Sequence, residues 1–515
     1  MSVDTNNAAF QDALNLIQYT RQSVFLTGKA GTGKSTFLRY VCENTKKKHV
    51  VLAPTGIAAI NAGGSTMHSF FKLPFYPLLP DDPNLSLQRG RIHEFFKYTK
   101  PHRKLLEQIE LIIIDEISMV RADIIDAIDR ILRVYSHNLR EPFGGKQLLL
   151  VGDVFQLEPV VKNDEREILN RFYPTPYFFS ARVFGQIDLV SIELQKVYRQ
   201  TDPVFVGVLD HIRTNTAGAA DLQLLNTRYG SQIEESEADM YITLATRRDT
   251  VDSINEKKLA ELPGESITFE GVIEGDFPES SLPTSQELVL KPGAQIIFIK
   301  NDFDRRWVNG TIGVIAGIDE EEETIYVITD DGKECDVKRD SWRNIRYRYN
   351  EKTKEIEEEV LGSFTQYPIR LAWAITVHKS QGLTFSRVVI DFTGGVFAGG
   401  QAYVALSRCT SLDGIQLKKP INRADIFVRP EIVNFAGRFN NRQAIDKALK
   451  QAQADVQYAA AARAFNKGDM EECLEQFFRA IHSRYDIEKP VPRRLIRRKL
   501  GIINTLKEQN KKLKE

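Results

Sequence analysis

Cysteine is scarce in this 515-residue sequence, and the four residues, Cys42, Cys335, Cys409 and Cys473, include no C-x-x-C pair. Such wide spacing argues against a structural zinc site or a disulfide framework and favours a reducing compartment. Long apolar runs are also lacking, since none approaches the ~18 residues of a membrane span. The opening stretch, MSVDTNNAAF, has neither the basic nor the apolar region of a signal peptide. No membrane association is therefore expected.

The sequence has no excess of charge of either sign, with 69 basic and 69 acidic residues. A net charge of zero does not exclude a polyanionic partner, because phosphate binding depends on local charge. Acidic runs occur at 319–323 and 355–359, and basic runs occur at 338–349 and 493–499. The simplest interpretation of each run is a solvated face. The basic run near the end either contacts nucleic acid or only solvates a helix.

A chain of this length is expected to form two to four domains. From residue 23 to about 200, the short apolar runs SVFL, HVVLA, LIII and QLLLV alternate with helix-like segments. Runs that are apolar on both faces predict a parallel sheet covered by helices, so residues 1–200 are predicted to form an α/β domain. Within it, residues 72–103 form an insertion. Its Pro-rich, aromatic start at 72–85 is predicted to protrude, because proline is excluded from central strands.

Residues 201–430 are predicted to form a second α/β domain, with strands in MYITLA and RVVIDF. Inside it, residues 288–365 alternate polar and apolar side chains and contain the turn signal Asp331-Gly332, which predicts an inserted all-β module. Residues 431–515 are predicted to be helical. The stretch 459–481 has a Lys-Gly-Asp break between two helices, similar to one tetratricopeptide-like hairpin. Because solenoid repeats need neighbours, we expect this hairpin to pack on the body.

The strongest motif is GKAGTGKS at residues 28–35, which stands between an apolar run and the helix-like TFLRYV. Its glycines allow backbone N–H groups to converge on the phosphates of a nucleotide, and the positive end of the following helix faces the anion. Lys34 supplies a point charge to the same oxygens, and the Ser35 hydroxyl is suited to bind Mg²⁺. The residues predicted to bind the nucleotide here are Gly28, Ala30, Gly31, Thr32, Gly33, Lys34, Ser35 and Thr36.

Two carboxylates, Asp115 and Glu116, follow the apolar run LIII. Adjacent carboxylates at a strand end are costly unless a cation or a reaction compensates for them. Asp115 is predicted to hold Mg²⁺, and Glu116 is predicted to orient and deprotonate the attacking water. In GDVFQLEPV, Gln156 follows the next strand. It either contacts the γ-phosphate and the water, or it caps a turn.

The segments GKAGTGKS, APTGIAA, GGSTMHSFF, IIDEISMV, GDVFQLEPV, LQKVYRQ, TVHKSQGLTF and YVALSRCTSLDGI occur in the order found in superfamily-one DNA helicases. The sequence resembles the petite-integration-frequency (PIF) helicases, the RecD-like branch, over roughly residues 5–430. The stretch DEISMVRADIIDAIDRILR followed by PFGGKQLLLVGD is similar to that family's signature region. The resemblance implies two RecA-like P-loop domains, a wedge insertion in the first, an SH3-like β module in the second, and a helical tail outside the shared core.

The resemblance also implies roles for residues on both sides of the nucleotide. Gln11 would read the adenine, and Tyr198 would stack on it. Arg199 and Arg408 would neutralise charge on the transferring phosphoryl group, and Gly382 would lie close to the same phosphate. Each arginine has the alternative of a surface ion pair.

A second set of residues matches the strand-binding motifs of the family. They combine hydroxyl, imidazole, cationic and aromatic groups, which backbone contact and base stacking require. The set is Pro54, Thr55, His68, Phe71, Thr246, Arg247, His378 and Lys379. For Phe71, a position in the hydrophobic core is an equal alternative.

In the β module, RRWVNGT (305–311) and WRNIRYRY (342–349) interleave aromatic and basic residues. Alternation would put Arg346 and Arg348 on one face, opposite the neighbouring tyrosines. The family carries a module here that lines the exit of the single strand. The alternative is an exposed edge strand kept soluble by its arginines.

The leading hypothesis is an ATP- and Mg²⁺-dependent DNA helicase, whose two RecA-like domains close on ATP and step along one strand. The resemblance implies 5′→3′ movement on single-stranded DNA, unwinding of DNA forks, and action on G-quadruplex DNA or RNA–DNA hybrids. DNA replication, repair, recombination and telomere maintenance are the associated processes. A monomer is expected in solution, and the helical tail is a candidate surface for a protein partner. The short N-terminal extension favours a cytoplasmic, bacterial member, and a eukaryotic one would be nuclear or mitochondrial.

Two alternatives remain at this level. One is a strand translocase that displaces proteins but unwinds duplexes weakly, for which the 72–85 stretch is the discriminating feature. The other is a scaffold that uses the nucleotide only as a switch. The full hydrolytic set argues against the scaffold, because a switch does not need to retain it.

Overall fold

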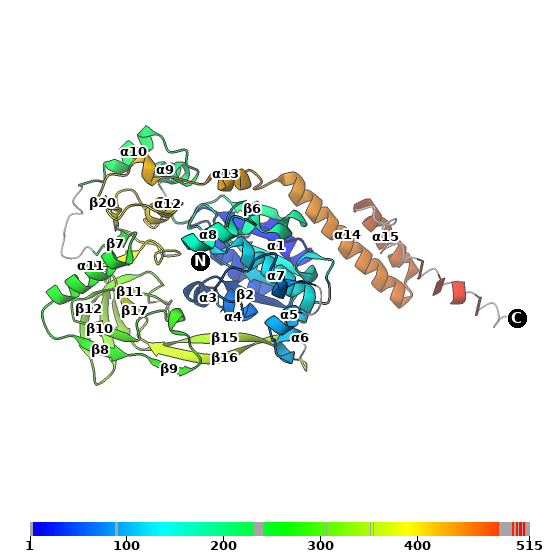
Figure 1. Ribbon diagram of the computed structural model, residues 1–515, viewed down its shortest axis with the longest axis horizontal. Coiled ribbons are helices and arrows are strands. Elements are labelled where there is room, and N and C mark those ends of the chain that lie inside the picture. Colours follow the sequence, from blue (N-terminus) through cyan, green and yellow to red (C-terminus); the bar gives the residue numbers. More distant parts are fainter. Residues whose placement is uncertain are drawn as a thin grey trace. The chain divides into compact units, whose positions relative to one another are not determined.

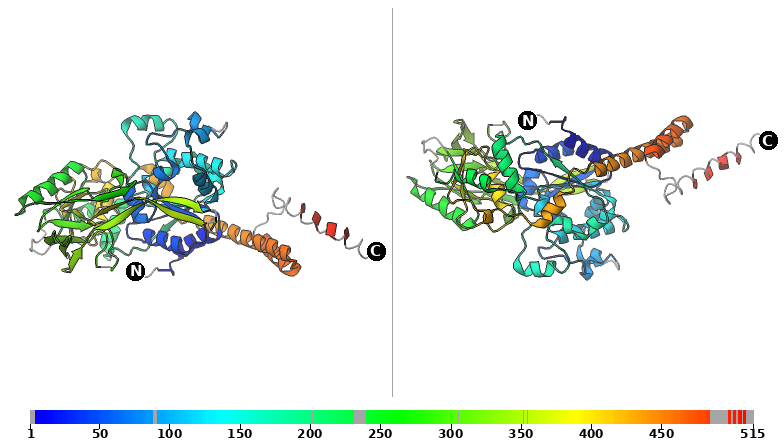
Figure 2. Two further views of the ribbon diagram at one scale, coloured as in Figure 1. Left: turned by 90° about the horizontal axis from the view of Figure 1, so that it is seen from below. Right: turned by 90° about the horizontal axis from the view of Figure 1, so that it is seen from above.

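The computed structural model describes residues 4–87, 91–200, 202–230, 240–304, 306–350, 352–353, 355–483, 497–498, 501–502, 504–506 and 508–509. The chain divides into two compact units, Met1–Thr5 with Ser23–Phe439, and Asn6–Gln22 with Asn440–Glu515 (Figures 1 and 2). Residues 1–200 are expected from the sequence to form one domain, but Asn6–Gln22 belongs to the second unit. None of the helices in the described part of the chain combines the length and apolarity that a membrane crossing requires.

A six-stranded parallel sheet forms the centre of the first α/β block, in the order β3-β2-β4-β5-β1-β6. Every residue of β1, β4 and β5 is buried, which is why these segments are continuous apolar runs. The predicted parallel sheet is confirmed. The strands are β1 (Val24–Gly28), β2 (His49–Ala53), β3 (Ser65–Thr66), β4 (Leu111–Ile114), β5 (Gln147–Val151) and β6 (Val190–Leu194).

The α-helices of this block are α2 (Lys34–Asn44), α3 (Gly56–Ala62), α4 (Met67–Phe71), α5 (Arg91–Phe95), α6 (Lys100–Gln108), α7 (Ala122–Tyr135) and α8 (Asn163–Leu169). Of these, α5 and the start of α6 belong to the insertion at 72–103. Leu73, Leu78 and Leu85 are buried in the core of the block, whereas Phe75 is 84% exposed and Tyr76 is 52% exposed. The insertion is therefore anchored by its apolar residues, and Phe75 and Tyr76 form its exposed tip.

The second α/β block has a four-stranded parallel sheet in the order β18-β7-β19-β20. Its strands are β7 (Ile242–Ala245), β18 (Ala374–Thr376), β19 (Val388–Asp391) and β20 (Ile415–Leu417). The helices that follow the first block are α9 (Pro203–Arg213), α10 (Ala219–Asn226), α11 (Arg248–Glu261), α12 (Gln401–Leu406) and α13 (Pro430–Ala436). This block has its own core, to which α9 and α12 contribute.

Between β7 and β18 lies an antiparallel β region. It contains a five-stranded sheet in the order β14-β13-β12-β11-β17, the pair β10-β8, and the three-stranded group β15-β16-β9. Its strands are β8 (Ile267–Glu270), β9 (Val272–Gly275), β10 (Glu287–Leu290), β11 (Gln295–Phe298), β12 (Ile312–Asp319), β13 (Thr324–Thr329), β14 (Glu334–Val337), β15 (Asp340–Asn350), β16 (Glu355–Gln366) and β17 (Ile369–Leu371). The β structure thus extends on both sides of the expected 288–365.

Strands β15 and β16 form a long ribbon that packs against the first block. Arg346 and Arg348 are exposed while Tyr347 and Tyr349 are buried, as alternation predicts. Both tyrosines belong to the core of the first block, and the Val51 N–H donates to the Tyr347 hydroxyl at 3.4 Å. In this conformation the two tyrosine rings are buried in the core and cannot stack on bases. Arg305, from the same expectation, lies outside the described residues.

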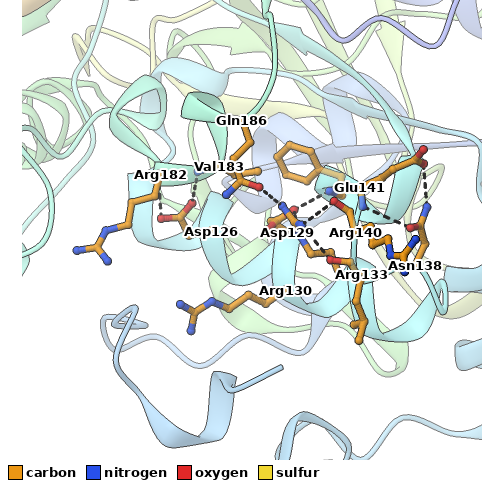
Figure 3. Close-up of polar contacts among 12 residues, drawn as sticks. Asp126, Asp129, Arg130, Arg133, Asn138, Arg140, Glu141, Arg182, Val183 and Gln186 are labelled. Carbon is orange, nitrogen blue, oxygen red and sulfur yellow. Dashed lines mark hydrogen bonds and ion pairs between the residues drawn. The ribbon is translucent and has the colours of Figure 1, made fainter. Parts of the chain in front are cut away.

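Helix α7 carries buried carboxylates at every third position, Asp123, Asp126 and Asp129. Each accepts a backbone N–H from a different segment, and Figure 3 shows the contacts of the last two. Asp123 accepts from Leu78 at 3.0 Å, which ties the insertion to α7. Asp126 accepts from Val183 at 3.0 Å. Because buried backbone donors need partners, these carboxylates determine how the loops pack on α7.

Asp129 also forms a buried ion pair within α7. Arg133 Nε donates to both of its oxygens at 2.9 and 2.8 Å, and the Phe143 N–H donates to Oδ1 at 2.6 Å. Arg133 Nη2 donates in turn to the Gln186 side chain at 2.8 Å (Figure 3). The pair is therefore fully hydrogen-bonded, the condition under which a buried ion pair is tolerated.

We expect Asp129→Ala to lower the free energy of unfolding by about 3–5 kcal/mol, because Arg133 is left buried without a counter-charge. Urea unfolding measures this change. The double variant Asp129→Leu with Arg133→Met is expected to regain most of the loss. The matched control is Glu141→Ala, an exposed carboxylate that accepts from Asn138, with an expected cost below about 0.5 kcal/mol. An equal loss in both single variants would contradict the assignment.

The second unit consists of α1 (Ala8–Tyr19), α14 (Arg442–Lys467) and α15 (Met470–Ser483). Gly468, with a φ of 84°, ends α14 at the Lys-Gly-Asp break seen in the sequence. The Tyr458 and Phe477 rings, 6.0 Å apart, join α14 and α15. Arg442 forms ion pairs with Asp12 and Asp446, and so connects α14 with α1.

Candidate nucleotide and nucleic-acid site

The loop between β1 and α2 lies between Gly28, the last residue of β1, and Lys34, the first residue of α2. Gly31 and Gly33 have φ values of 79° and 88°, in the region that glycine adopts without strain. A Cβ atom on Gly31 would lie 2.4 Å from the Arg199 Cβ, so the close approach of these segments requires glycine here. Ala30 and Thr32 lie in the loop itself, and Ser35 and Thr36 follow in the first turn of α2. The predicted phosphate cradle therefore has the required backbone.

Lys34 lies folded over this loop. Its Nζ donates to the carbonyl oxygens of Gly28 and Lys29 at 2.7 and 3.0 Å. Burial lowers the pKa of Lys34, while the negative charges of Asp153 and Glu116 oppose that shift. The ammonium group thus lies among acidic groups, at a position from which it can turn to a bound phosphate.

Asp115 and Glu116 follow the end of β4. Glu116 adopts a left-handed φ of 50°, and its N–H donates to Asp115 Oδ1 at 3.0 Å. Burial raises the pKa of Asp115. Burial, and then the charge of Asp115, raise the pKa of Glu116 to about 7. A carboxyl group that titrates near neutral pH is suited to accept a proton from water.

The two predicted arginines come from separate segments. Arg199 Nη1 donates to the Ser407 carbonyl at 3.3 Å. Arg408 is only 1% exposed, and its guanidinium donates to carbonyl oxygens, including that of Val404 at 3.0 Å, and to the Ser407 hydroxyl. Neither forms an ion pair with a carboxylate in the described part of the chain. Burial, and then Arg199, lower the pKa of Arg408 to about 9. The alternative of a surface ion pair is therefore wrong for Arg408.

Three residues of the site are absent from the sequence prediction. The Ala30 N–H donates to the hydroxyl of Tyr403 in α12 at 2.9 Å, which joins the cradle to the second block. Asp153 is buried at the end of β5 and pairs with Arg213 of α9 at 3.1 Å. Asp153 had a recognisable signal, since it follows an apolar run in GDVFQ. Tyr403 begins the motif YVALSRCTSLDGI, although only folding brings it to the cradle, and Arg213 had no signal in the sequence.

The remaining nucleotide residues vary in position. The Tyr198 N–H donates to the Gly31 carbonyl at 2.9 Å, so this tyrosine lies beside the cradle. Gln156 is 8% exposed, and its side-chain amide makes no hydrogen bond with any described residue, which contradicts a turn cap. Gly382, with a φ of 79°, lies in the loop after β18. Gln11 lies in α1 of the second unit, so its adenine contact stays a prediction.

The predicted strand-binding residues of the first block are not all accessible. Pro54 and Thr55 follow β2, and Thr55 caps α3. His68 lies in α4, and its ring stacks on Phe75 at a centroid distance of 5.0 Å. Phe71 has no exposed surface and belongs to the core of the block. The predicted DNA contact of Phe71 is therefore wrong, and the alternative of a core position is confirmed.

In the second block, the predicted strand-binding residues follow neighbouring parallel strands. Thr246 and Arg247 follow β7, while His378 and Lys379 follow β18, which pairs with β7. The carboxyl ends of parallel strands share one edge, so folding brings these residues together. The Thr246 hydroxyl is buried without a hydrogen-bond partner in the described part of the chain, whereas Arg247 Nε donates to the Gly394 carbonyl at 3.1 Å.

The glycine cradle, the paired carboxylates and the two arginines define a P-loop nucleoside triphosphatase whose site is built from two α/β blocks. The PIF1-like helicase family model matches residues 4–207. The ATP-dependent DNA helicase Pif1 of Campylobacter jejuni is 33% identical over 412 residues, which cover 77% of this chain and 88% of that protein. The chain belongs to the PIF1-like helicase family, and it is an ATP-dependent DNA helicase.

Solved structures of Bacteroides Pif1 show the same fold. The complex with ADP-AlF4 is 41% identical and has a TM-score of 0.77, with 85% of this chain and 97% of that chain covered. The complex with ADP-AlF3 and single-stranded DNA is 42% identical with the same coverage, but its TM-score is 0.60. At nearly equal identity, the present conformation is thus more similar to the complex without the DNA strand.

Proposed function

We propose that this helicase moves 5′→3′ along single-stranded DNA and separates the duplex at forks. The observation that carries this proposal is the two-block site, since the cradle belongs to one block and Arg408 to the other. Binding of ATP would draw the blocks together and hydrolysis would release them. The Bacteroides relative in complex with single-stranded DNA supports movement on one strand. The direction of movement rests on the family resemblance.

In the nucleotide site, we assign the hydrolytic roles to residues that lie around the cradle. Lys34 would contact the β- and γ-phosphates, and Glu116 would activate water. Arg199 and Arg408 would neutralise the transferring phosphoryl group, and Gln156 would contact the γ-phosphate. For the adenine, the proposed contacts are Gln11 and Tyr198, and Gly382 would lie close to the γ-phosphate.

Mg²⁺ fits this site with help from the nucleotide. Among the described residues, no three His, Cys, Asp or Glu side chains gather into a metal site. Ser35 and the buried carboxylate of Asp115 would therefore supply only part of the coordination, with phosphate oxygens supplying more, which is the usual pattern for Mg²⁺. The ion would neutralise charge on the phosphates.

For the DNA strand, we propose contacts from both blocks. Thr55 and His68 would hold it in the first block, with Pro54 shaping the same loop, and Thr246, Arg247, His378 and Lys379 would hold it in the second. The lower similarity to the DNA-bound Bacteroides complex supports a rearrangement of the domains when the strand binds. Each ATP cycle would then move the DNA contacts of one block relative to those of the other block.

The exposed tip of the insertion, Phe75 and Tyr76, is the proposed wedge. These are aromatic side chains on a segment anchored to α7 through Asp123, so a duplex end could be pressed against a supported surface. The β region is proposed to act as the family's SH3-like module. G-quadruplex DNA and RNA–DNA hybrids are proposed as further substrates, a monomer as the solution state, and the helical unit as a surface for a protein partner.

Unwinding of forked DNA with a single 5′ or 3′ tail tests the proposal. We expect the unchanged protein to open only the 5′-tailed substrate, because the motor would track that strand. We expect the variant Phe75→Ala with Tyr76→Ala to unwind roughly tenfold more slowly while its DNA-stimulated ATP hydrolysis is retained. A gel or fluorescence assay of strand separation measures both effects.

Opening of only the 3′-tailed substrate would refute the direction. Full unwinding by the double variant would show that the tip is not the wedge. If the unchanged protein hydrolyses ATP on single-stranded DNA but separates neither fork, the translocase alternative is the correct one.

A further inference from the structure

Three basic side chains at one seam of the first unit lack an ion-pair partner among the described residues. Arg370 lies in β17, and His378 and Lys379 follow β18; we call these three residues the basic seam. None of the three side chains forms a hydrogen bond or an ion pair with a residue in the described part of the chain. His378 and Lys379 belong to the predicted strand-binding set, but Arg370 does not.

The position of Arg370 follows from the register of its strand. β17 pairs antiparallel with β11, and Arg370 lies opposite Ile297. Its neighbours Ile369 and Leu371 pack into the core of the β region. Because side chains alternate along a strand, Arg370 points to the other face, where Ile297 and Ala372 belong to the core of the second α/β block. Arg370 therefore lies where the β region meets the second block.

The charge of Arg370 acts directly on Lys379. Partial burial lowers the pKa of Arg370 to about 10. Partial burial also lowers the pKa of Lys379, and the positive charges of Arg370 and Arg248 lower it further, while the charge of Asp252 opposes the shift. Two cations close enough to repel each other, and partly removed from water, destabilise the fold unless an anion compensates for them.

Among the other enclosed arginines, Arg130 donates to the carbonyl oxygens of Leu85 and Pro80, and five more fall into two groups. Arg121, Arg133 and Arg213 each pair with a carboxylate at 2.8–3.1 Å. Arg199 and Arg408 lack such a partner in the described residues, and both lie at the phosphate site. Arg370 belongs to the second group. An arginine that is held without a counter-charge is suited to an anion supplied from outside the chain.

We propose that Arg370 binds a backbone phosphate of single-stranded DNA, beside Lys379. The inference rests on the proposed function and extends it, because it adds a phosphate contact from the β region to those of the second block. A second observation points to a ligand at this edge: the buried hydroxyl of Thr246, at the end of the strand next to β18, has no partner among the described residues. A guanidinium forms two parallel hydrogen bonds with a phosphate, so Arg370 would hold the strand in a defined position.

The test compares Arg370→Met with Lys333→Met. Lys333 is an exposed cation of the same β region that pairs with Asp331, so its charge is already compensated. Fluorescence anisotropy of a labelled oligothymidine, measured over a series of salt concentrations, gives the affinity and its salt dependence. ADP affinity and the melting temperature are measured on the same three proteins.

We expect Arg370→Met to bind the oligothymidine roughly tenfold more weakly, with a logarithmic salt slope shallower by about 0.7, as the loss of one phosphate contact implies. Its melting temperature is expected to stay equal or rise, because an uncompensated charge is removed. Lys333→Met should bind DNA as the unchanged protein does. Unchanged DNA affinity and slope in Arg370→Met would overturn the inference, and so would a loss of ADP affinity instead. Absence of oligothymidine binding by the unchanged protein would contradict the proposed function as well.

Discussion

Replacement of Arg408 by alanine is expected to lower DNA-stimulated ATP hydrolysis by at least ~10³-fold. Arginines that neutralise a transferring phosphoryl group have effects of about 10³–10⁵ on turnover. In this chain Arg408 is buried and belongs to the block opposite the cradle, and its partners among the described residues are carbonyl and hydroxyl groups only. Steady-state phosphate release in the presence of oligothymidine measures the effect.

Two further variants separate catalysis from folding. Arg408→Lys keeps the positive charge but loses the planar guanidinium group, which can donate two parallel hydrogen bonds, so we expect its ATP hydrolysis to be strongly impaired as well. Arg423→Ala removes an arginine of the second block that contacts Asn215, and it should retain turnover. ADP binding by the Arg408 variants shows that the cradle is still formed. If Arg408→Ala keeps turnover within about tenfold of the unchanged protein, the two-block mechanism is wrong.

Replacement of Glu116 by glutamine is expected to lower turnover by about 10²–10⁴-fold, the usual contribution of a general base. Because the pKa of Glu116 is raised to about 7, the carboxylate that accepts the proton is the minor form at lower pH. Turnover of the unchanged protein should therefore rise as the pH increases through about 7. An amide in place of this carboxyl group cannot titrate, so the rise should be missing in the variant.

The matched control is Glu110→Gln, at the opposite end of β4, where the carboxylate accepts the Lys48 N–H at 3.0 Å. It should keep both the rate and the pH profile. The measurement is phosphate release at saturating ATP from about pH 5.5 to 8.5, around the titration of Glu116. A rate for Glu116→Gln close to that of the unchanged protein would assign the base to another group, such as the buried Asp153, whose charge acts on Glu116.

The places of the motif residues relative to the strands could be predicted from the sequence, because the motif spacing follows from local geometry. The cradle needs glycines next to a strand end, and Asp115 and Glu116 directly follow a buried strand. The role of Phe71 was ambiguous, because the residue type of an aromatic side chain does not show whether it faces solvent or the core. Tyr347 shows the same limit. Its alternation was predicted, but its burial against the first block depends on how the ribbon packs.

Residues that act through distant contacts could not be predicted. Arg213 has no motif around it, yet it forms an ion pair with Asp153 of the first block, which is 60 residues earlier in the chain. Arg370 is a single polar residue in an apolar run, and only the register of β17 turns it toward the seam.

By itself, the sequence determined the nucleotide chemistry and the two α/β blocks, because strand periodicity and the glycine spacing act over a few residues. The tertiary structure alone decided which arginines are enclosed without a counter-charge among the described residues and which aromatic rings are buried. The reason is that burial and charge compensation depend on segments that are far apart in the chain and meet only on folding.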